Sequence, residues 1–241
     1  MDYHISAEDK RKLQREVIHS RGELLFSRAI VLSEGETEEQ VLPMLFQKYF
    51  GEEPFSLGIN FIGVGGSGAK YKPFLRLARD FNIPVFIFSD GEPNIVQKLK
   101  YAYEEFFGET DLHNSPNITI LDGTNFEGYL LNNGFEKLIK DAISKTEGDE
   151  KIKTWISEKQ GTPTRAVRKN VPNCVTCNQA ILESPTRDYN TADGEKRAIL
   201  EILSSKKPTY AKAVAEELCM LTIEDLPPKI IKIFEQIKTE I

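Results

Sequence analysis

The chain has 241 residues, of which 40% are hydrophobic and 28% charged, and its formal net charge is −6. These values are typical of a globular domain with a sizeable core. The sequence also excludes a membrane-spanning protein, because no apolar run approaches the roughly 20 residues that cross a bilayer. The negative charge argues against a protein that coats nucleic acid, although residues 151–241 carry 15 Lys and Arg against 12 Asp and Glu. The start of the chain is charged and unlike a signal peptide, so we expect a cytoplasmic location.

Short apolar runs alternate with amphipathic segments after an N-terminal helix or linker expected at residues 1–24. Four strands are predicted, at residues 29–33, 59–64, 84–89 and 117–121. Apolar residues at helical spacing follow each strand. This alternation predicts an α/β fold at residues 25–132, with a mostly parallel sheet flanked by helices. The strand pattern then fades, and residues 133–241 are predicted to form a mainly helical subdomain.

Acidic residues follow two of the predicted strands at the point where each strand ends. Glu34 and Glu38 come after the run that ends at residue 33, and Asp90 and Glu92 come after the run that ends at residue 89. The carboxyl ends of parallel strands lie side by side, so the two clusters can share one crevice. Oxygen ligands without nearby His or Cys favour Mg²⁺ or Mn²⁺. The pattern therefore predicts metal-dependent phosphate chemistry.

Simpler interpretations exist for parts of these clusters. Glu36 and Glu39 are best explained by a favourable interaction with the dipole at a helix N-terminus. An Asp-Gly pair such as residues 90–91 is also a common turn. The run Gly65-Gly66-Ser67-Gly68 can cradle a phosphate or act as a flexible turn, and it lacks the Lys of a nucleotide-hydrolysing P-loop.

The three cysteines do not point to a disulfide framework. Cys174 and Cys177 form a single CxxC pair, whereas a structural zinc site normally needs a second pair of ligands. None of the three histidines lies near this pair in the sequence. Zinc or redox chemistry is therefore disfavoured here.

The order of these elements resembles the Toprim domain shared by topoisomerases, primases and nucleases of the overcoming-lysogenization-defect (OLD) family. The closer resemblance is to the OLD nucleases. It is carried by residues 22–38, residues 63–68, and the segments Phe74-Leu75-Arg76-Leu77 and Ile83-Pro84-Val85. The likeness covers residues 22–132 well and the remainder loosely.

The resemblance implies which residues bind metal. Glu34 and Glu38 match the family's first pair of acidic ligands, and Asp90 matches the first acid of its DxD motif. Glu92 occupies the second acidic position of that motif as Glu instead of Asp. Glu127 resembles a further acidic ligand, although it can also be a Glu that stabilises a helix N-terminus.

The resemblance also implies a catalytic lysine. Lys207 resembles the Lys that precedes a Gly-x-Phe-Ala segment in OLD proteins and stabilises charge on the phosphate. Pro208 replaces that Gly, and Lys206 is an alternative. The expected catalytic residues are then Glu34, Asp90 and Lys207.

The function implied is two-metal hydrolysis of phosphodiester bonds by a DNA endonuclease or nickase that uses Mg²⁺ or Mn²⁺. OLD proteins carry an ATPase ahead of Toprim, and none of its motifs occurs here. We therefore expect that this chain binds no nucleotide cofactor and that an ATPase domain or subunit is a missing partner. The resemblance also implies a homodimer and a role in phage defence or DNA repair. A primase-like Toprim enzyme and a non-catalytic module that binds metal and nucleic acid are the alternatives.

Overall fold

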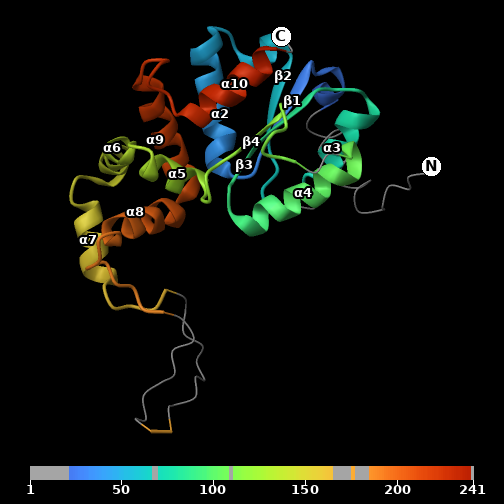
Figure 1. The fold of residues 1–241 in the computed structure, drawn as a ribbon. Helices are drawn as coiled ribbons and strands as arrows, with labels where there is room; N and C mark the ends of the chain where they lie inside the picture. The colour runs from blue at the N-terminus through green and yellow to red at the C-terminus, as the bar shows by residue number, and fades with distance from the viewer. Residues whose placement is uncertain (1–21, 67–69, 109–110, 165–174, 177–184, 240–241) are drawn as a thin grey trace.

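A four-stranded parallel sheet lies at the centre of the protein. The computed structural model describes residues 22–66, 70–108, 111–164, 175–176 and 185–239. Its strands are β1 (Ala29–Ser33), β2 (Ile59–Gly63), β3 (Val85–Ser89) and β4 (Ile118–Ile120). They lie in the order β2-β1-β3-β4, and every neighbouring pair is parallel (Figure 1). The predicted α/β class and parallel sheet are confirmed.

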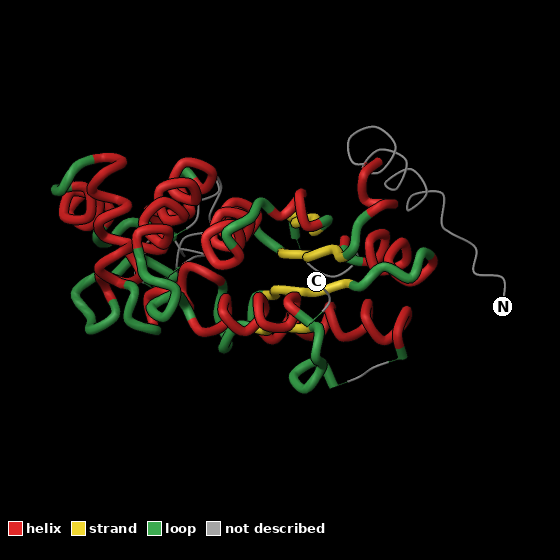
Figure 2. Tube along the Cα trace, turned by 90° about the horizontal axis from the view of Figure 1, so that it is seen from above, coloured by secondary structure: helices red, strands yellow, loops and turns green. Residues whose placement is uncertain are grey.

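The two faces of the sheet bury alternate residues of the same strand. On one face, Val31 and Phe88 join a large apolar cluster, and on the other, Leu32 and Ile87 join a second cluster. A strand buried on both faces must be apolar at nearly every position, as β1 and β3 are. Figure 2 shows the strands between two layers of helices.

Two helices cover the face that carries Leu32 and Ile87, namely α3 (Lys72–Asp80) and α4 (Pro93–Phe107). The remaining helices of the described chain contribute to the other layer or extend from it. They are α2 (Glu36–Phe50), α5 (Phe126–Asn132), α6 (Glu136–Glu147), α7 (Lys151–Lys159), α8 (Gly194–Ser205), α9 (Lys207–Met220) and α10 (Pro228–Lys238). Short 3-10 helices at Gly22–Phe26 and Pro54–Leu57 precede β1 and β2. None of the described helices is long and apolar enough to cross a bilayer.

The helices beyond residue 132 share a core with the sheet. Helix α9 packs along α2, and α10 packs against β3 and β4. Val214 of α9 and Phe234 of α10 belong to the same apolar cluster as Val31 of β1. Both parts of the chain therefore contribute to one apolar cluster. A separate helical subdomain after residue 132 stays a prediction.

Several features predicted from the sequence lie outside the described residues. These are most of the N-terminal helix or linker, at residues 1–21, and the pair Cys174 and Cys177. Residues 161–164 are described, and Pro163 there forms an isolated antiparallel bridge with Thr186.

Candidate active site

The ends of β1 and β3 meet at the point where the strand order changes direction. The chain moves from β1 to β2 on one side and then to β3 on the other side of β1. Ligands of open α/β sheets bind at such a position, beyond the carboxyl ends of the strands. Glu34 is the first residue after β1, and Asp90 is the first residue after β3. The two predicted acidic clusters therefore flank one crevice.

Two helix N-termini add acidic side chains to this crevice. Glu38 lies in the first turn of α2 with 2% of its surface exposed, and Glu127 lies in the first turn of α5 with 6% exposed. The Thr37 hydroxyl donates a hydrogen bond of 2.6 Å to Oε1 of Glu127, so the two helix ends are tied together. Asn125 caps α5 by accepting a hydrogen bond from the N–H of Gly128 at 2.9 Å.

The buried carboxylates repel one another. Burial, followed by the negative charges of Asp90 and Glu127, raises the pKa of Glu38 to about 8. Burial, followed by the charges of Glu34 and Glu127, raises the pKa of Asp90 to about 7. The pKa of Glu34 is also raised, first by burial and then by Glu92. An ordinary carboxyl is ionised well below these values, so this cluster requires protons or a cation to neutralise it.

Three carboxylate oxygens in the described structure are buried without a hydrogen-bond partner: Oε2 of Glu34, Oε2 of Glu38 and Oδ1 of Asp90. Buried polar atoms of this kind are rare in native proteins and often indicate an ion that belongs there. Hard oxygen donors suit Mg²⁺ or Mn²⁺. Among the described residues, however, no three His, Cys, Asp or Glu side chains are already arranged to hold a metal ion. The donor chemistry fits a divalent cation, and the side chains would have to move together to bind it.

One lysine faces the cluster and its neighbour does not. Nζ of Lys207, at the start of α9, lies 3.9 Å from Oε1 of Glu127. Its positive charge also opposes the upward pKa shifts of Glu38 and Asp90. Lys206 instead donates a 2.6 Å hydrogen bond to Glu147 on α6. The geometry therefore favours Lys207 over Lys206 as the lysine of this site.

Comparison with known proteins assigns this part of the chain to a family. Residues 25–91 match the family model described as "Overcoming lysogenization defect protein-like, TOPRIM domain". Residues 25–91 are an OLD-like Toprim domain. The match includes Glu34, Glu38 and Asp90, whereas Glu127 and Lys207 lie beyond it. No curated protein matches the sequence.

Solved structures extend the likeness in fold beyond the Toprim domain. The C-terminal region of the OLD protein of Xanthomonas campestris pv. campestris is 17% identical, with 90% of this chain and 95% of that chain covered and a TM-score of 0.59. The C-terminal region of the Burkholderia pseudomallei OLD protein is 18% identical, with 89% and 98% covered and a TM-score of 0.59. The fold expected from the resemblance is confirmed. A Toprim domain implies a metal-binding fold of the nuclease or primase type.

The other elements predicted for the Toprim site lie around its rim. Glu92 is exposed at the N-cap of α4, where its charge still reaches Glu34. Gly65 and Gly66 have φ values of +65° and +132°, a region that favours glycine. The N–H of Gly66 donates to the carbonyl of Glu34 at 3.2 Å, which holds this loop against the end of β1. Residues 67 and 68 of the glycine-rich run lie outside the described structure.

Sequence reasoning missed two residues beside the Toprim carboxylates. Thr37 lies within an acidic run that gives it no signal of its own, although its hydroxyl holds Glu127. Tyr71, at the start of α3, is completely buried, and this burial, followed by the charge of Glu34, raises the pKa of Tyr71 well above its usual range. In the sequence, the only signal for Tyr71 is its hydroxyl next to the apolar residues of α3.

Gly91 holds the end of β3 close to the end of β4 within the Toprim site. A Cβ atom on Gly91 would lie 1.7 Å from the carbonyl oxygen of Leu121 and 2.5 Å from the N–H nitrogen of Gly123, and both are backbone atoms. We expect Gly91→Ala to lower the free energy of unfolding in urea by about 3 kcal/mol or more, at or above the usual cost of overpacking. Gly134→Ala is the control, because Gly134 has a φ of +93° and open space around it. Backbone strain there should cost only about 1–2 kcal/mol. Equal losses in the two variants would contradict the steric explanation.

Proposed function

We propose that this protein is a metal-dependent nuclease that hydrolyses phosphodiester bonds in DNA. The observation that carries the proposal is the set of buried carboxylate oxygens without partners on Glu34, Glu38 and Asp90, at the strand ends of an OLD-like Toprim domain. Burying these charges together lowers the stability of the fold, and clusters of this kind are typical of functional sites. The enzyme would act as an endonuclease or nickase.

The carboxylates of Glu34, Glu38 and Asp90 would hold Mg²⁺ or Mn²⁺, with Glu127 and Glu92 completing the ligands of two ions. Bound cations of this kind make an attacking water more acidic and neutralise the leaving oxygen. Burial of Glu34, Glu38 and Glu127 keeps competing water away from their carboxylates, which strengthens their attraction for a cation. Thr37 fixes the position of Glu127 through its 2.6 Å hydrogen bond.

Lys207 would supply positive charge to the scissile phosphate. Its ammonium group lies 3.9 Å from Glu127, and the Lys207 side chain is 39% exposed, so a substrate at the crevice can reach it. A fixed cation is worth most where negative charge develops in the transition state. Helix α9 holds Lys207 in place because its buried face packs along α2.

The direct test is incubation of supercoiled plasmid with purified protein in Mg²⁺ or Mn²⁺. Nicked or linear product that disappears with EDTA supports the nuclease. Absence of cleavage at high protein concentration, together with binding of the metal, would instead favour the non-catalytic module. Primer synthesis from a template and nucleotides would favour the primase-like alternative.

Replacement of Lys207 distinguishes the two neighbouring lysines. We expect Lys207→Ala to lower the nicking rate by about 10²–10³-fold, because a fixed charge near the phosphate is lost. Lys206→Ala is the matched control and should stay near the wild-type rate, since Lys206 pairs with Glu147 on the surface. Gel analysis of plasmid over time measures both rates. The reverse order of effects would assign the role to Lys206.

The partners follow from the same proposal. We propose DNA as the substrate, an ATPase domain or subunit as the regulatory partner, and a second copy of the chain as the dimer partner. A cytoplasmic location and a role in phage defence belong to the proposal as well. The chain spans 95–98% of the OLD C-terminal regions compared above, so these regions are the appropriate reference for reconstitution with an ATPase.

A further inference from the structure

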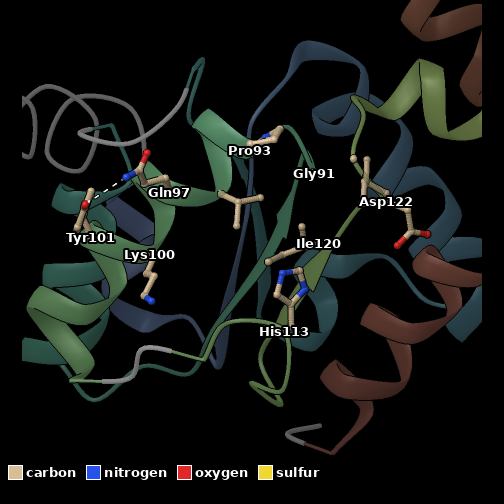
Figure 3. A pocket seen from close by; sticks show the side chains of 11 residues that line it. Gly91, Pro93, Gln97, Lys100, Tyr101, His113, Ile120 and Asp122 are labelled. Carbon is tan, nitrogen blue, oxygen red and sulfur yellow. Dashed lines mark hydrogen bonds between the residues drawn. The ribbon is translucent and has the colours of Figure 1, made fainter.

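A cavity of about 570 Å³ opens beside the acidic crevice. It lies between α4 and the end of β4, and Figure 3 shows side chains from both sides directed into it. Its volume falls within the range of about 300–1,000 Å³ that is common for ligand pockets. None of the residues assigned to metal binding lines it.

The lining of this cavity combines an apolar floor with a polar rim. Val96 and Ile120 provide apolar surface, and Gln97, Lys100 and His113 provide polar groups around it. Lys100 and His113 lie on opposite walls (Figure 3). Asp122 also lines the cavity, but its carboxylate pairs with Lys229 at 2.9 Å. The rim therefore offers a cation and an imidazole to a ligand with a flat apolar part and a negative charge.

The cavity adjoins the acidic cluster at Gly91. This residue forms part of the cavity wall and directly follows Asp90. A DNA strand that places one phosphate at Asp90 would therefore bring a neighbouring nucleotide to the mouth of the cavity. A base within a duplex is stacked and paired, so only an unpaired base could enter.

We propose that this cavity binds an unpaired nucleotide next to the cleavage site, with its base on Val96 and Ile120 and its phosphate at Lys100. His113 provides a flat ring on which the base stacks. The proposal deepens the nuclease function and rests on it for the origin of the nucleotide. The substrate class it implies is DNA with a single-stranded or distorted segment at the cut.

Proton NMR of the histidine rings tests this proposal without any cleavage. The chain has three histidines, so the signal that disappears in His113→Gln identifies His113. The full chain is titrated in EDTA with thymidine monophosphate, a short oligothymidylate, an abasic oligonucleotide of equal length and inorganic phosphate. We expect the His113 signal to move with the oligothymidylate and to move far less with the abasic strand and phosphate.

Comparison of thymidine monophosphate with the oligothymidylate shows whether the cavity binds a free nucleotide or only one within a strand. A shift with both thymidine monophosphate and the oligothymidylate shows that the cavity recognises a nucleotide by itself. A shift with the oligothymidylate alone shows that the strand must deliver it. No shift at millimolar concentrations of either, or an equal shift with the abasic strand or with phosphate, overturns the proposal.

Two variants test the walls of the cavity. Lys100→Ala should weaken oligothymidylate binding about fivefold or more, and Val96→Trp should block it by filling the cavity. Lys137→Ala on α6 is the matched control for loss of an exposed lysine. Circular dichroism shows whether each variant is folded, and unchanged binding in a folded Val96→Trp protein also overturns the proposal. Because these measurements contain no divalent metal, a failed nuclease assay leaves their result unaffected.

Discussion

Asp90→Asn is expected to reduce plasmid nicking by about a thousandfold or more, and Glu34→Gln should do the same. Each change keeps the size of the side chain but removes a charge from the buried cluster. The loss corresponds to several kcal/mol of the transition-state stabilisation that a bound metal supplies. Calorimetric titration with Mn²⁺ should show weaker binding in both variants, and gel assays of nicking measure the rates.

Glu36→Gln is the matched control for these two variants. Glu36 belongs to the same acidic run as Glu34 but is exposed at the start of α2. It should retain cleavage and metal binding close to those of the wild type. Full activity in Asp90→Asn would show that Asp90 is not a catalytic ligand. The cleavage would then come from another site or from a contaminating nuclease.

The stability of the metal-free protein should fall as pH rises from about 4.5 to about 8. Burial and neighbouring charges raise the pKa of Glu38 to about 8 in the folded state, against 4.5 for an ordinary Glu. Below about pH 4.5 the carboxyl is protonated in both states. Within the window the unfolded chain releases this proton before the folded one does, so the free energy of unfolding declines. Above about pH 8 both states are ionised and the decline ends.

Glu38→Gln should remove the part of this pH dependence that comes from Glu38 and leave the part that comes from Asp90, whose pKa is raised to about 7. At pH 8 we expect the metal-free variant to be more stable than the wild type, by on the order of a few kcal/mol. Mg²⁺ should then stabilise the wild type more than the variant, because a ligand that binds only the folded state adds stability. Urea unfolding at several pH values, with and without Mg²⁺, measures both effects. A variant less stable than the wild type in EDTA at pH 8 would contradict the repulsion described above.

Much of the sheet was predictable because its strands are short and unusually apolar. Strands β1 and β3 are buried on both faces, so every position from Ala29 to Leu32 had to be apolar. The same pattern located the ends of the strands and hence Glu34 and Asp90. The first turn of α2 was equally visible, because the apolar residues that follow Glu38 recur at helical spacing.

Contacts between distant segments were not predictable in the same way. Helical spacing shows that α9 and α10 have a buried face, but it does not reveal that α2, β3 and β4 cover those faces. For the same reason the sequence left Lys206 and Lys207 as alternatives. The pairing of Lys206 with Glu147 is a tertiary contact between α8–α9 and α6. The cavity beside Gly91 likewise depends on the spacing between α4 and β4.

The packing of α9 along α2 sets the order in which the site can be completed during synthesis. The ribosome makes Glu34, Glu38 and Asp90 early, whereas Lys207 follows 117 residues after Asp90. A nascent chain therefore carries its mutually repelling carboxylates before the lysine and the apolar surface of α9 and α10 that accompany them. A cation that binds the acidic residues at this stage would favour folding of the early segment. The proposed catalytic centre would be assembled only when α9, which carries Lys207, has docked on α2.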